Sequence, residues 1–130
     1  MTPVATFAQI AAANTGADLS TNAALVFTGS TNGSLLTSVI IKYLPGTSTV
    51  ATAARLWLNN GSALGTSTNN SLITEITVAI ITTTQTAATV DYAFNMPRNG
   101  LFVPNTYRAY VTIGTYSTGT FMCCGLGGHY

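Results

Sequence analysis

The sequence predicts an all-β fold: a single antiparallel β-sandwich of about eight strands, with a jelly roll as the preferred topology. Short runs of alternating apolar and polar residues recur along the chain, and turn signals rich in Gly, Pro and Asn separate them roughly every 10–15 residues. The composition is dominated by β-branched residues and is poor in the Glu, Lys and Gln that build surface helices. The chain of 130 residues and 13.4 kDa has the length of one domain.

Each predicted strand is recognised by an alternation with a period of two residues. In residues 35–44, Val39, Ile41 and Tyr43 share one face of the strand, and Lys42 lies on the other. The same pattern, or a short apolar run between turn signals, identifies the remaining strands as residues 24–28, 53–58, 72–80, 90–96, 101–103, 107–113 and 120–124. Many short strands at this spacing are typical of a sandwich in which one face of each sheet is buried.

Two segments fit this pattern less well. Residues 1–19 are rich in Ala and Thr and show no clear period, so we expect either an edge strand or an arm that lies on a neighbouring molecule. Residues 20–130 then form the sandwich domain. Residues 81–89 are polar and of low complexity, which predicts an exposed connection.

Charge is unusually sparse, with four Lys or Arg, three Asp or Glu and a formal net charge of +1. Nucleic-acid binding needs several clustered cations, so no nucleic-acid partner is expected. The chain contains no apolar run of transmembrane length and no signal-peptide pattern at its start, so we expect no membrane partner and synthesis in the cytoplasm. A mean hydropathy of +0.38 in such a chain indicates that partners cover much of its surface.

The sequence offers few groups for chemistry. The three carboxylates are scattered, and the single histidine, His129, has no nucleophile beside it in the sequence. We therefore expect no enzyme activity, no cofactor and no metal site, and we expect Glu75 to pair with Arg55 or Lys42 across a sheet. Adjacent cysteines on a strand point to opposite faces, so the 123–124 pair is expected to be reduced, with one thiol in the core.

The best candidates for an interaction surface are two pairs of side chains, Arg55 with Trp57 and Arg108 with Tyr110. Alternation places both members of each pair on the face opposite the neighbouring apolar residues. Trp, Tyr and Arg are the side chains most enriched at the energetic centres of interfaces. Two alternatives stay open: a loop of the same subunit covers Trp57, or the exposed rings form a platform that stacks against a sugar.

Several stretches resemble a group of short tailed-bacteriophage proteins that end in Gly-Gly-x-Tyr. The resemblance covers roughly residues 20–130 and is carried by turn and strand patterns. These are residues 31–42 (TNGSLLTSVIIK), 54–61 (ARLWLNNG), 70–77 (NSLITEIT), the Val-Pro-x-x-Tyr of 103–107, 111–114 (VTIG) and the closing Gly-Gly-x-Tyr of 127–130. The chain departs from the pattern in the polar 81–89 connection and in its cysteine pair.

The resemblance implies a non-enzymatic β-sandwich subunit of a virion. Together with the sparse charge it leads us to expect a capsid decoration, or cement, protein that binds the major capsid protein or other virion proteins. A homo-oligomer is expected, with a trimer favoured. The alternatives are a tail, neck or fibre subunit of the same virion, and a glycan-binding module.

Overall fold

The computed structural model describes residues 1–16, 18–44, 50–80, 82, 84, 86 and 88–130. The described chain consists of nine strands and one short 3₁₀ helix, η1. In order they are β1 (Thr2–Ile10), β2 (Ala24–Thr28), β3 (Ser34–Tyr43), β4 (Thr52–Asn59), η1 (Ser67–Asn69), β5 (Asn70–Val78), β6 (Asp91–Ala93), β7 (Leu101–Val103), β8 (Arg108–Ile113) and β9 (Phe121–His129). The predicted β-sandwich is therefore confirmed.

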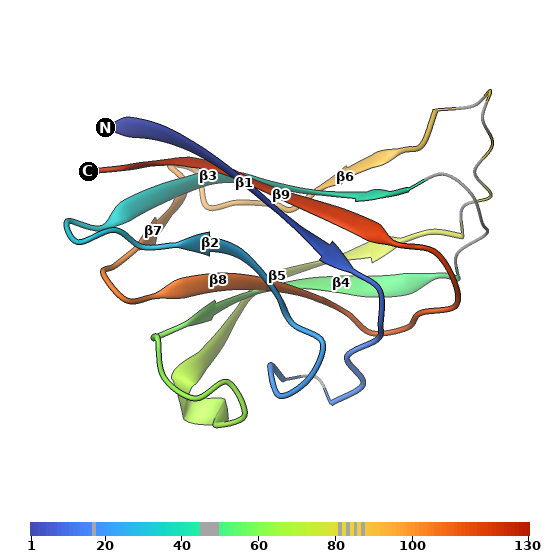
Figure 1. Cartoon of the computed structure of the whole chain (residues 1–130), viewed down its shortest axis with the longest axis horizontal. Helices are drawn as coiled ribbons and strands as arrows, with labels where there is room; N and C mark the ends of the chain where they lie inside the picture. Colours follow the sequence, from blue (N-terminus) through green and yellow to red (C-terminus); the bar gives the residue numbers. More distant parts are fainter. Residues whose placement is uncertain (17, 45–49, 81, 83, 85, 87) are drawn as a thin grey trace.

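The strands form two antiparallel sheets that pack face to face (Figure 1). One sheet has the order β1-β9-β3-β6, with β7 also paired to β3, and the other has the order β2-β8-β4-β5. Because β6 and β7 pair with opposite ends of β3, they occupy one strand position between them. Counted this way, the chain has eight positions, four in each sheet, and their order is the jelly-roll arrangement of two Greek keys.

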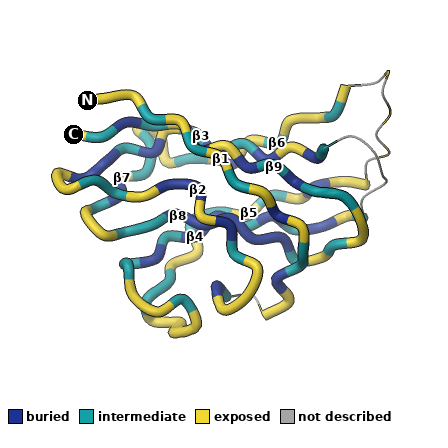
Figure 2. The backbone as a smooth tube through the Cα atoms, in the orientation of Figure 1, coloured by how far each residue is buried: buried dark blue, intermediate teal, exposed yellow. Residues whose placement is uncertain are grey.

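The core lies between the sheets and consists of the inward-facing side chains of strands from both sheets (Figure 2). The face of β3 predicted to be buried is buried, with Val39, Ile41 and Tyr43 fully inaccessible. Tyr43 packs edge to face against Phe121 at a centroid distance of 4.9 Å. Its hydroxyl donates a hydrogen bond to the carbonyl of Thr118, so the polar end of the ring is satisfied inside the core.

Glycines in β9 allow β2 and β9 to come close together. A Cβ added at Gly125 would lie 2.5 Å from the carbonyl oxygen of Val26 in β2, a distance that real Cβ atoms do not reach. On the same side of the sandwich, the hydroxyl of Thr6 in β1 donates to that same carbonyl. The edges of the two sheets are therefore tied together where β1 faces β2, and the absence of a side chain at residue 125 makes this possible.

The first 19 residues were expected to form an edge strand or an arm. Residues Thr2–Ile10 form β1, an edge strand that pairs with β9 along its whole length, from Thr2 opposite His129 to Ile10 opposite Phe121. This strand is the ninth, beyond the eight expected from the alternating pattern. In Figure 1 the two ends of the chain lie side by side because β1 and β9 are neighbours.

The cysteine pair behaves as expected. Both thiols are free, Cys123 is buried in the core and Cys124 is exposed on the outer face of β9. Burial, and to a smaller degree the neighbouring Cys124, raises the pKa of the Cys123 thiol to about 12. The expected exposed connection over residues 81–89 is described only at 82, 84, 86, 88 and 89, and its other residues lie outside the described part of the chain.

Candidate interaction surface

The four side chains singled out from the sequence lie on one face, the outer face of the β2-β8-β4-β5 sheet. Trp57 of β4 is the direct partner of Tyr110 of β8. Arg55 lies on β4 in register with Thr112, and Arg108 is at the start of β8. The sheet thus brings the two predicted pairs together across neighbouring strands.

The two aromatic residues of this set are covered by the chain itself. Trp57 is only 8% exposed and Tyr110 only 7%, because Leu19 of the 11–23 connection packs over both rings. The indole N–H of Trp57 donates to the Thr112 hydroxyl at 3.0 Å, which satisfies its polar atom. Of the two alternatives left open for Trp57, the structure therefore has the loop cover, and the outward aromatic platform expected for sugar stacking is not presented.

The loop that carries Leu19 is held by its own polar groups. The Asn14 side-chain amide donates to the carbonyls of Asp18 and Thr21, and the backbone amide of Asn14 donates to Ile113 of β8. The Asp18 carboxylate accepts hydrogen bonds from the hydroxyl and the backbone amide of Ser20, at 2.6 and 2.9 Å. These two bonds lower the pKa of Asp18 below its ordinary value of 3.8.

The cationic members of the set have different surroundings. Arg55 pairs with Glu75 across β4 and β5 at 3.0 Å, which confirms one of the two cross-strand pairings expected for Glu75. Arg108 is half-buried beside Asn59, its partner in register. The aromatic row of this face therefore lies under a loop, and the leucines at its two ends, Leu25 and Leu72, are each 43% exposed.

The outer face of the other sheet is very different, and we call it the apolar face. Register places its outward residues in four rows that cross β1, β9, β3 and then β6 or β7. The rows are Pro3-Gly128-Leu35-Phe102, Ala5-Leu126-Ser38, Phe7-Cys124-Ile40-Ala93 and Gln9-Met122-Lys42-Asp91. The first three rows contain one polar side chain, that of Ser38, and the exposed Thr37 at the β3 bulge lies beside them, with its hydroxyl donating to the carbonyl of Leu126 at 3.0 Å.

Large apolar side chains stand exposed on the apolar face. Phe7 is 74% exposed, Phe102 53% and Leu126 39%. The Phe102 ring lies 6.4 Å from the ring of Tyr130, which is also exposed. Phe, Leu and Tyr together on one sheet surface form a contiguous apolar patch of the kind that marks interaction sites.

Charge on the apolar face is confined to one end. Lys42 and Asp91 are partners in register and form an ion pair with an N–O distance of 2.9 Å. The pair is neutral as a unit and lies in the last row, beside Gln9 and Met122. The rest of the face carries no charge, so burying it against a partner has no cost of desolvating ions.

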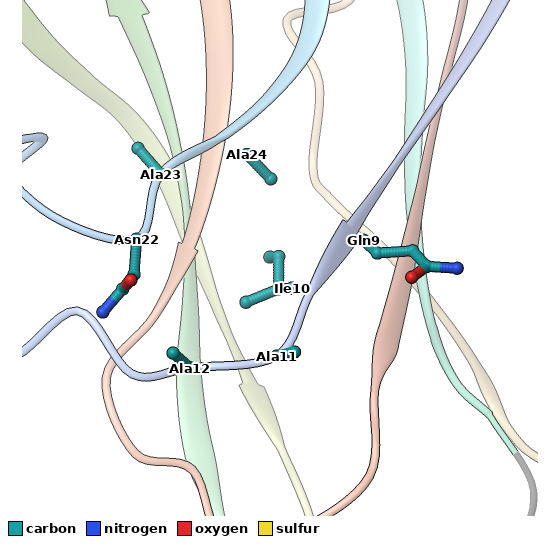
Figure 3. A pocket seen from close by; sticks show the side chains of 7 residues that line it. All are labelled: Gln9, Ile10, Ala11, Ala12, Asn22, Ala23 and Ala24. Atoms are coloured by element: carbon teal, nitrogen blue, oxygen red, sulfur yellow. The ribbon is translucent and has the colours of Figure 1, made fainter.

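The hollows of the surface contain little chemistry. One lies where β1 ends and β2 begins (Figure 3) and is lined by Gln9, Ile10, Ala11, Ala12, Asn22, Ala23 and Ala24. None of these side chains titrates, and the Asn22 amide already donates to the carbonyl of Ala13 at 2.7 Å. Within the described ranges no three His, Cys, Asp or Glu side chains gather in a way that could hold a metal ion.

One Ser–His contact occurs, between Ser34 of β3 and His129 of β9, with 2.6 Å between Oγ and Nδ1. Ser34 is fully buried, and its oxygen also accepts a hydrogen bond from the backbone amide of Ser30. A nucleophile has to be open to its substrate, and this hydroxyl is not. The contact instead joins β3 to β9 beside the Phe27 ring, which lies 5.7 Å from the imidazole.

The asparagines near the β4–β5 connection are also engaged internally. The Asn59 amide donates to Asn70 at 2.7 Å, and the Asn70 amide donates to the carbonyl of Leu64 at 2.6 Å. Asn69 donates to the carbonyl of Ala63 at 3.0 Å. These side chains hold the connection in place and do not form an open row of donors for a sugar.

The sequence analysis did not predict the apolar face, although the residues of β9 indicated it. In the segment from Phe121 to Leu126 both alternating sets are apolar, and a strand that is apolar on both faces is typical of one covered on both sides. The outward Phe7 gave no such signal, because its neighbours in β1 do not alternate clearly.

Comparisons of this chain with protein-family models, with curated proteins and with solved structures find no match. In the part of the chain that the structure covers, no helix has the length and apolar character needed to cross a membrane.

Proposed function

We propose that this protein is a structural subunit that works by burying the apolar face against other protein in an assembly. The observation that carries the proposal is the contrast between the two sheets. One outer face has its aromatic residues covered by a loop of the same chain and exposes leucines only at the two ends of that row, whereas the other exposes Phe7, Leu126 and Phe102. Exposed apolar area of this extent is costly in a free-standing protein and is retained where a partner covers it.

The assembly we propose is the virion of a tailed bacteriophage, with the protein as a capsid decoration protein. The sequence resemblance to short virion proteins supports this choice, as do the sparse charge and the fold, since jelly rolls are common in viral capsids. Its role is mechanical: surface buried between neighbouring subunits of the assembly, copies of this chain included, opposes their separation. A total of roughly 1,200–2,000 Å² per contact is sufficient for specific, stable binding.

The proposal is tested by the number of copies of this chain on purified particles, measured by quantitative mass spectrometry against the major shell protein. A decoration protein is expected in a simple ratio to the shell protein. A few copies per particle would instead favour a tail, neck or fibre subunit, and absence from particles would refute the virion assignment.

A second measurement connects the number of copies to the surface. Leu126→Asp places a carboxylate in the apolar face and is expected to lower occupancy on the particle. The matched control is Leu72→Asp on β5 of the other sheet, where the wild-type leucine is similarly exposed, at 43%. Equal occupancy for both variants would contradict the assignment of the binding surface.

A further inference from the structure

We propose that the occupant of the apolar face is a second copy of this chain, related by a two-fold axis, so that two sandwiches pack sheet against sheet. This inference deepens the proposed function and rests on it only for the identity of the binding surface. Three properties of the face support it: its area, its charge and the fact that the described molecule has one such face.

The area of the face lies at the lower end of what a specific dimer needs. The sheet has four strand positions about 4.8 Å apart, and its long strands β1 and β9 pair over nine residues with a rise of about 3.3 Å each. The face therefore measures about 19 by 30 Å, or about 570 Å². Two copies bury about 1,100 Å², which exceeds the roughly 1,000 Å² that separates specific interfaces from incidental contacts.

The charge of the face suits contact with itself. A two-fold interface brings the same surface from both copies together, so any net charge on it would be repelled by its own copy. Among the described residues the ions on the apolar face are Lys42 and Asp91, which form a neutral pair. Because the pair carries no net charge, the whole face can take part in the contact.

The symmetry follows from the number of apolar faces. A three-fold ring needs two different complementary patches on each subunit, whereas a two-fold dimer needs one patch that fits itself. The opposite outer face carries Arg55, Glu75 and Arg108, and Leu19 covers the middle of its apolar row, which leaves only the separate end leucines exposed. Among the described residues one face is thus suited to association, and the geometry favours a dimer over the trimer expected from the sequence.

Leu126 is the residue whose replacement is expected to disturb the dimer contact most, because of its position within the face. In the order β1-β9-β3-β6 the strand β9 lies inside the sheet, and Leu126 stands on its outer side between Ala5 and Ser38. A residue near the two-fold axis meets its own copy. Leu126→Asp would therefore bring two carboxylates together in an apolar contact.

The first test is the mass of the purified chain in solution, measured by sedimentation velocity over a range of concentrations. Wild type is expected at twice 13.4 kDa in the micromolar range. Leu126→Asp is expected to raise the dissociation constant of the dimer by about 30-fold or more, while Leu72→Asp on the other sheet leaves that constant at its wild-type value. Circular dichroism checks that each variant is folded, and Phe7→Thr, which introduces a β-branched residue that suits a strand, provides a second disrupting change.

The second test uses a thiol that the protein already carries in the apolar face. Cys124 is exposed in the row of Phe7, whereas Cys123 is buried in the core. Alkylation of Cys124 by a maleimide is expected to slow as the chain concentration rises through the dimer range. In Leu126→Asp the rate is expected to stay constant over the same range.

A wild-type chain that is monomeric at about 100 μM, or that forms trimers, would overturn the dimer. So would a dimer that Leu126→Asp and Phe7→Thr leave intact. These outcomes are distinct from failure of the proposed function. A monomeric chain whose Leu126→Asp variant still loses particle occupancy would refute the dimer and leave the virion role standing. A dimer that is absent from particles would refute the virion role and leave the dimer standing.

Discussion

Replacing Leu19 with alanine tests how the loop covers the tryptophan. Leu19 is 1% exposed and lies over Trp57 and Tyr110. Losing most of a buried leucine side chain costs about 2 kcal/mol in transfer free energy, and up to about 5 kcal/mol where a cavity stays open. Because the loop lies at the surface and can close over the gap, we expect the lower end, about 2 kcal/mol.

The assay uses the fluorescence of Trp57, the single tryptophan of the chain. Leu19→Ala is expected to shift the emission to longer wavelength, to raise quenching by acrylamide and to lower the Tm by about 6–10 °C for a domain of this size. Leu72→Ala is the control, because Leu72 is the cross-strand partner of Trp57 but is largely exposed and does not cover it. Emission and quenching equal to wild type in Leu19→Ala would refute the proposed cover.

Three further predictions concern the core, the thiols and the loop. Gly125→Val is expected to destabilise the fold by several kcal/mol in urea unfolding, because its Cβ would meet a β2 carbonyl at 2.5 Å. A Cβ at Gly65 would make only an ordinary contact with Ser20, at 3.9 Å, so Gly65→Ala should change stability by less than about 1 kcal/mol. The native chain is expected to react with one equivalent of a thiol reagent, at Cys124, and with two in denaturant, since Cys123 is buried with its pKa raised to about 12. The folded-state pKa of Asp18 is lowered. The contribution of its carboxylate to the stability of the fold is therefore present above pH 3.8 and is lost as the pH falls below that value. Tryptophan quenching should therefore rise on acidification in wild type, and Asp18→Asn should remove that dependence; identical acid profiles would contradict this.

The fold class followed from local chemistry. The alternation in residues 35–44 placed Val39, Ile41 and Tyr43 on one face, and the structure buries all three. The turn signals at residues 29–33 and 97–100 lie between strands, because Gly, Asn and Pro act on the backbone conformation of their own neighbours. β1 was the ambiguous element, since its register is imposed by pairing with β9 rather than by an alternating pattern of its own.

The candidate surface was predicted in part. Alternation correctly placed Trp57 and Arg55 on the outer side of β4, and the sheet brought Tyr110 beside them. Alternation says which side of a strand a residue occupies, but it does not say whether another segment covers that side. Leu19 comes from a loop far away in the chain, and no local pattern around Trp57 announces it.

By itself, the sequence determined the β-sandwich, most of its strands, the opposite orientation of the two cysteines and the scarcity of charge, because each depends on neighbouring residues or on composition. Only the tertiary structure decided which outer face is exposed. Phe7 and Leu126 were unremarked apolar residues in the sequence, and the pairing of β1 with β9 places them on one surface. The physical reason is that exposure depends on contacts between distant segments, and these exist only once the two sheets have assembled.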